Sequence, residues 1–161
     1  IAVAQLIWKV SDGENPRNRS GARTFKSSMP CYIEKAHPKC IKPNIEVIQI
    51  RFGETIMCLV PDGIIIILRK KVSYIDNENI KIRTDNTGSY ETMRPPKDAK
   101  NIKTRWLYEN MDGSPDKRRK ENPKRYDCQC GSIIIDTPIT QVVLFVSDVG
   151  RVDESSALIV M

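Results

Sequence analysis

The chain has 161 residues, of which 40% are apolar and 29% charged, which fits one folded domain and excludes an intrinsically disordered chain. Its longest apolar run, residues 64–68, is far shorter than the roughly 20 residues of a membrane-spanning helix. We therefore expect a single β-rich domain over residues 1–161, with no transmembrane segment. The chain starts without a basic leader, so we also expect that any signal peptide has been removed.

The net charge of +6 is concentrated in one segment of the chain. Residues 94–125 hold 11 basic and 5 acidic residues, whereas the rest of the chain holds 15 of each sign. Such a concentration is typical of surfaces that bind phosphates, sulfated sugars or acidic proteins. It is equally typical of a solvated loop that keeps a protein soluble, so charge alone leaves both interpretations open.

The first half of the chain is rich in Ile, Val and Thr, which favour strands. Residues 2–10 and 45–51 predict strands, and a change of phase in the second predicts a bulge near Val47. Residues 55–60 and 64–72 flank Pro61-Asp62-Gly63 and predict a hairpin, with Gly63 at a position of positive φ. Because its first five residues are all apolar, the second strand is predicted to be central and covered on both faces.

The second half alternates in the same way between short strands and turns. Turns are predicted at residues 76–79 and 85–89, and residues 11–29 and 110–126 are expected to be mobile loops. The further predicted strands are residues 80–83, 102–108, 128–135, 139–146 and 157–161. No helical stripe extends over three turns. The fold class is therefore predicted to be all-β, an antiparallel sandwich or barrel of about eight or nine short strands, disulfide-bonded and with little or no helix.

Five cysteines are the disulfide candidates, namely Cys31, Cys40, Cys58, Cys128 and Cys130. In an extended strand the Cα atoms of Cys128 and Cys130 would lie about 7 Å apart, at the limit for a disulfide. We therefore expect each to bond to one of the three early cysteines. The fifth cysteine would stay free or link two chains into an oligomer.

Asn18-Arg19-Ser20 is an N-glycosylation sequon in a predicted surface loop. Together with the cysteines, it favours a secreted or extracellular location. Non-reducing mass spectrometry with glycosidase treatment tests both expectations at once.

Catalytic and metal-binding signals are weak. His37 is the only histidine in the chain, and no nucleotide-binding or hydrolase motif is present. Cys31, His37 and Cys40 have a spacing that fits zinc poorly. We expect no cofactor, no metal and no enzymatic activity. A small hydrolase or nuclease built around His37 is the alternative hypothesis that ranks third.

The segment around residue 115 combines cations with aromatic side chains, a pairing common at recognition surfaces. The candidate binding residues are Arg105, Tyr108, Lys117, Arg118, Arg119, Lys120, Lys124, Arg125 and Tyr126. Trp106 is expected to pack in the core. Residues 117–120 would also suit a protease that cleaves after basic residues.

The leading hypothesis is a secreted or cell-surface module that recognises another macromolecule through this basic loop. The partner would be a protein receptor, another acidic macromolecule or a sulfated glycan. A basic β-barrel that binds nucleic acid ranks second, since the sequence shows no aromatic pairs on adjacent strands to stack bases.

Overall fold

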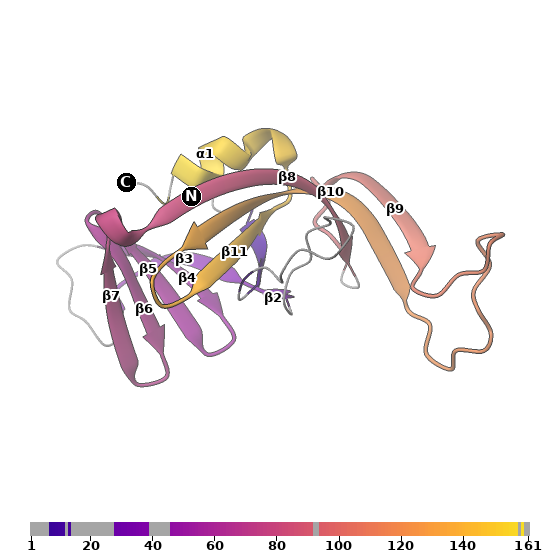
Figure 1. Cartoon of the computed structure of the whole chain (residues 1–161), viewed down its shortest axis with the longest axis horizontal. Coiled ribbons are helices and arrows are strands. Elements are labelled where there is room, and N and C mark those ends of the chain that lie inside the picture. Colours follow the sequence, from indigo (N-terminus) through magenta and orange to yellow (C-terminus); the bar gives the residue numbers. More distant parts are fainter. Residues whose placement is uncertain are drawn as a thin grey trace.

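The computed structural model describes residues 7–11, 13, 28–38, 46–91, 94–157 and 159, with the backbone alone for 87–91. These residues form two sheets in which all the pairings between strands are antiparallel. Figure 1 shows the two sheets in a body from which a long ribbon extends to one side. The predicted all-β class is confirmed.

One of the two sheets uses its strands in chain order, whereas the other pairs the first strands of the chain with the last ones. One sheet has the order β3 (Tyr32–Ala36), β4 (Val47–Phe52), β5 (Thr55–Val60), β6 (Gly63–Leu68) and β7 (Lys71–Asp76). The other has the order β2 (Ser28–Pro30), β1 (Ile7–Ser11), β11 (Gln141–Val146), β10 (Lys124–Asp136) and β8 (Lys81–Glu91), with β9 (Lys100–Trp106) also pairing with β10. The described residues thus form eleven strands, more than the eight or nine expected.

The core lies between the two sheets and is mainly aliphatic. Ile50, Met57 and Ile64 of one sheet belong to the same buried cluster as Ile133 and Leu144 of the other. Full burial of each such side chain stabilises the fold by roughly 1.5–3 kcal/mol. The two sheets therefore pack face to face, as in a β-sandwich.

Among the described residues, helical structure is confined to short segments. They are the 3-10 helices η2 (Asn77–Asn79) and η3 (Val149–Arg151) and the helix α1 (Val152–Ala157). Val152 of α1 is 3% exposed and belongs to the main core cluster. No helix within the described ranges is long and apolar enough to cross a membrane.

The hairpin predicted over residues 55–72 is confirmed for residues 55–68, but its second strand ends at Leu68, since residues 69–70 form a turn and β7 begins at Lys71. The role of its glycine also differs. Strands β5 and β6 pair residue by residue from Thr55↔Leu68 to Val60↔Gly63. Gly63 is not among the described residues with positive φ. It is required for space, because a Cβ at this position would lie 2.2 Å from the backbone oxygen of Ile75.

Two other local predictions are wrong. The turn predicted at residues 85–89 lies inside β8, which continues unbroken from Lys81 to Glu91. The bulge predicted near Val47 is absent, since β4 pairs in constant register with β3 and β5. In each case pairing with a neighbouring strand outweighs the local preference of the sequence.

The expected long disulfides do not form between the described cysteines. No disulfide joins Cys31, Cys58, Cys128 or Cys130, all of which are buried, and Cys40 lies outside the described residues. Cys31 belongs to the main core, whereas Cys58 lies in a separate cluster with Val47 and Ile67. Cys128 and Cys130 instead face each other, with 3.2 Å between their Sγ atoms.

Candidate macromolecule-binding surface

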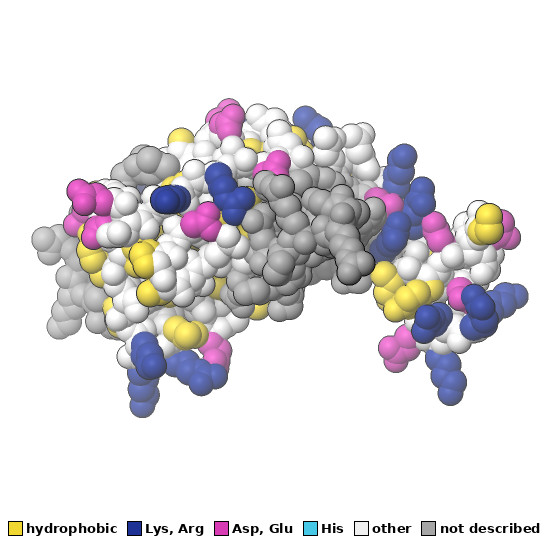
Figure 2. Space-filling model, in the orientation of Figure 1, with side chains coloured by type: hydrophobic (Ala, Val, Ile, Leu, Met, Phe, Trp, Pro, Cys, Tyr) yellow, Lys and Arg dark blue, Asp and Glu magenta, His cyan; other side chains and the backbone are white. Residues whose placement is uncertain are grey.

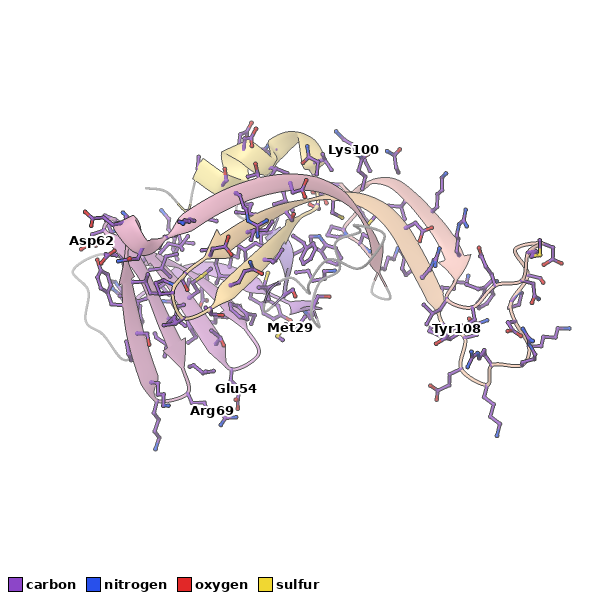
Figure 3. The ribbon with its side chains drawn as sticks, viewed as in Figure 1. Met29, Glu54, Asp62, Arg69, Lys100 and Tyr108 are labelled. Atoms are coloured by element: carbon purple, nitrogen blue, oxygen red, sulfur yellow. The ribbon has the colours of Figure 1, made fainter. Side chains whose placement is uncertain are left out.

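Strand β10 belongs to both the body and the ribbon. Its second half, from Gly131 to Asp136, pairs with β11, and its first half, from Lys124 to Gln129, pairs with β9. We call β9, residues 124–130 of β10 and the connecting residues 107–123 the arm, and residues 107–123 the tip loop. Figure 3 shows Lys100 at the start of the arm and Tyr108 toward its far end. The described core clusters include no residue of the arm, although Cys128 and Cys130 are buried at its base.

The tip loop is folded by its own hydrogen bonds. The amide of Asn122 spans it, because Asn122 Oδ1 accepts from the Tyr108 backbone N–H at 2.9 Å and Asn122 Nδ2 donates to the Tyr108 carbonyl at 2.7 Å. Asp112 Oδ1 accepts from the backbone N–H and the hydroxyl of Ser114, at 3.0 and 2.6 Å. These bonds lower the pKa of Asp112 below its ordinary value and favour its charged form.

Arg118 is engaged within the loop. Its Nε and one terminal nitrogen bind the two carboxylate oxygens of Asp116 at 2.9 and 3.0 Å. Hydrogen bonds from Arg118 lower the pKa of Asp116, and Asp116 in turn raises the pKa of Arg118. A bidentate pair leaves the guanidinium fewer donors for a ligand. Arg118 is therefore the least available of the four consecutive cations.

The neighbouring cations are more available. The guanidinium carbon of Arg119 lies 4.7 Å from the centre of the Tyr108 ring, which orients its charge at the surface. Lys117 and Lys120 are exposed and make no hydrogen bond or ion pair with any described residue. Figure 2 shows Lys and Arg side chains gathered at this end of the molecule. The tip therefore presents two unneutralised ammonium groups beside one stacked guanidinium.

The strands of the arm carry the remaining candidates on two faces. Lys124 pairs with Trp106 and Tyr126 with Thr104, so these four residues share one face. The ammonium of Lys124 lies 5.6 Å from the centre of the Trp106 ring.

Arg105 and Arg125 lie on the opposite face, where Asp127 binds both at 3.4 and 3.0 Å. Arg105 also binds Glu109 at 3.0 Å. The candidate residues therefore do not form one continuous patch, and the two arginines are partly neutralised.

An open groove of about 650 Å³ lies between the tip loop and the strands. It is lined by Thr104, Arg105, Trp106, Glu109, Met111, Asp112, Gly113 and Lys124. Trp106 is half-buried here and is absent from the described core clusters, contrary to the expectation that it packs in the core. The groove thus brings together the indole of Trp106, the ammonium of Lys124 and the carboxylates of Glu109 and Asp112, while the cations of residues 117–120 do not line it.

Other predicted sites contribute little to this surface. His37 is exposed at the end of β3, in the body. Asn18 lies outside the described residues. Among the residues that are described, no three His, Cys, Asp or Glu side chains are grouped to hold a metal ion.

The sequence did not identify four residues of this surface as functional, namely Trp106, Glu109, Asp116 and Asn122. The short spacing of Asp116 and Arg118 is a local signal that could have indicated their pairing. The contact of Trp106 with Lys124 depends on the register of β9 and β10, which no local pattern reveals.

Comparison with family models, curated proteins and solved structures found no match to this chain.

Proposed function

We propose that this protein is a binding module that recognises an acidic macromolecule through the end of its arm. The observation that carries the proposal is the pair of unneutralised cations, Lys117 and Lys120, beside the stacked Arg119 and Tyr108. Exposed charges of one sign accelerate the encounter with a partner of opposite charge. A rigid aromatic ring beside them adds contact area at a low cost in conformational entropy.

We further propose that the protein is secreted or displayed at a cell surface and that its partner is an acidic protein receptor or a sulfated glycan. The sequon at Asn18 supports this location. Deglycosylation of protein taken from its natural source should lower its mass if Asn18 is modified. Absence of that shift would remove the sequon from the argument.

Heparin, a soluble sulfated polyanion, is a direct probe of the arm. The double variant K117E/K120E should bind heparin at least about tenfold more weakly than the wild type, because two attractive contacts become repulsive. The control K70E/K71E makes the same change in net charge at the exposed turn between β6 and β7, in the body. It should bind within about twofold of the wild type at about 0.15 M salt, where exposed charges act over roughly 8 Å.

Equal losses in the two variants would show that heparin senses only the net charge of the protein. Unchanged binding in K117E/K120E would remove the tip from the site. The single variant R118E is a further comparison. Arg118 already binds both carboxylate oxygens of Asp116. The R118E variant should therefore weaken heparin binding less than K117E or K120E does.

Nucleic acid is the second candidate partner, and one observation favours it. The register of the arm places Trp106 and Tyr126 on the same face of adjacent strands, an arrangement that suits base stacking. A W106A variant should then weaken binding of a single-stranded oligonucleotide about tenfold and leave heparin binding nearly unchanged. Equal effects on both probes would favour the electrostatic surface alone.

A further inference from the structure

The two cysteines of β10 are in direct contact. Their Sγ atoms lie 3.2 Å apart, and both residues are buried, Cys128 at 4% and Cys130 at 1% exposure. A disulfide bond is about 2.05 Å long, so the sulfurs would need to approach by only about 1 Å to form one. In an ideal extended strand the Cα atoms of these two residues would lie about 7 Å apart, at the limit for a disulfide.

The neighbouring strand indicates why the approach is close. Between Asp127 and Gln129 the register of β10 against β9 shifts, because β9 spans the same distance with one additional residue. Asn101, in this part of β9, has a positive φ of 56°. Such bulges bend a ribbon and increase its twist, which allows side chains two residues apart to converge.

The residue between the cysteines is held on the other side of the strand. Gln129 is exposed, and its Oε1 accepts a hydrogen bond from Asn101 Nδ2 at 2.9 Å. Successive side chains of a strand point to opposite faces, so this bond helps to hold the backbone that directs both sulfurs to the buried face. Two elements thus define the geometry of the thiol pair.

The pair also lies where β10 exchanges one neighbour for another. Along β10, Gln129 is the last residue that pairs with β9, and Gly131 is the first that pairs with β11. Cys130 lies between these two positions, at the boundary of body and arm. A covalent link here would restrict the backbone at the point from which the arm extends.

We propose that Cys128 and Cys130 are a modification site that closes into a disulfide across Gln129. The oxidant is a disulfide of a small thiol, such as glutathione disulfide. One cysteine thiolate attacks it, forming a mixed disulfide and releasing one thiol, and the second thiolate displaces the other. The two cysteines lose two electrons and two protons in total, and the oxidant becomes two thiols.

Both sulfurs are covered in the folded protein, so the exchange takes place during folding or during local opening of the arm base. This proposal does not depend on the partner that the tip recognises. The bond should make the arm base more rigid, which predicts slower amide hydrogen exchange in residues 126–130 of the oxidised protein.

Tryptic peptide mapping tests the proposal directly. Cleavage after Arg125 and Arg151 yields one peptide, residues 126–151, that contains both cysteines, whereas Cys31, Cys40 and Cys58 fall on separate peptides. The full chain is refolded with glutathione disulfide, unfolded in acid, alkylated at its remaining thiols and digested. Peptide 126–151 should be unalkylated and about 2 Da lighter than its dithiol form, from the loss of two hydrogens.

Two results would overturn the proposal, namely a peptide 126–151 that carries two alkyl groups and one that is cross-linked to another peptide. The second result would restore the long bridges expected from the sequence. The variants C128S and C130S are the controls. Each should lose the lighter peptide and leave its single thiol alkylated or bonded to glutathione, and amide exchange should then be equal with and without oxidant.

Discussion

At Gly63 the fold tolerates no side chain. The nearest atoms to an added Cβ belong to the backbone of Ile75 in β7, at 2.2 and 3.0 Å, and this strand is paired along its length with β6. We expect G63A to lower the free energy of unfolding by about 1–3 kcal/mol, because two strands must move apart.

Urea denaturation of G63A and of G150A checks this expectation. At Gly150 an added Cβ would meet only side-chain atoms, Asp148 Oδ1 at 3.4 Å and Lys100 Nζ at 3.9 Å, which are ordinary contact distances. The loss in G150A should therefore be small. Comparable losses in the two variants would mean that the close approach to Ile75 is not the cause.

Cys31 is the residue at which burial most clearly alters titration. Burial raises the pKa of its thiol from 9.0 to about 12. Above about pH 9 the unfolded chain releases this proton while the folded protein retains it, so stability decreases as pH rises. The thiol should thus cost roughly 1–2 kcal/mol of stability between about pH 8 and about pH 10.5.

The variant C31A isolates this effect. Its cavity lowers stability by an amount that does not depend on pH, whereas the alkaline loss due to the thiol disappears. The difference in unfolding free energy between wild type and C31A should therefore shrink as pH rises. A difference that stays constant up to about pH 10.5 would contradict a strongly raised pKa in the folded state.

Among the elements, the tip loop depends on one side chain that spans it. Replacing Asn122 by Ala removes both of its hydrogen bonds to the Tyr108 backbone. We expect the Tyr108 amide to exchange hydrogen about 5- to 30-fold faster, which corresponds to the loss of about 1–2 kcal/mol of local stability. The midpoint of global unfolding should change little, because the main core cluster draws no residue from this loop.

Amide hydrogen exchange measured by NMR reports both quantities. The same measurement tests the prediction that residues 110–126 are mobile. A large fall in global stability in N122A would mean that the loop supports the sandwich.

How far each element could be predicted depends on where its determinants lie. The hairpin at residues 55–68 follows from adjacent turn residues, Pro61 and Asp62, between two apolar segments. Only the start of β8 was predicted, as a strand at residues 80–83. Its continuation could not be predicted, because Asp85, Asn86 and Gly88 have turn preferences and the strand continues by pairing with the distant β10. The candidate site divides in the same way, since the cations are evident in the sequence but their neutralisation by Asp116 and Asp127 follows from geometry.

For the whole molecule, the division between body and arm implies that the tip can be removed. We expect replacement of residues 108–122 by an Asn-Gly turn to leave the sandwich folded, since β9 and β10 are already paired at Trp106 and Lys124. The melting temperature should stay within about 3 °C of the wild type, and heparin binding should be lost.

Thermal unfolding and a heparin titration of this variant provide the check. Retained binding in a folded variant would move the site to the body. An unfolded variant would instead show that the arm takes part in the folding of the sandwich.

The shared strand β10 has a mechanical consequence. A pull on the tip would travel along one uninterrupted backbone into residues 131–136, which are paired with β8 on one side and β11 on the other. Tension along a strand loads the flanking ladders in shear, so many hydrogen bonds resist it together. The molecule would thus transmit force from a captured partner directly into its most buried layer.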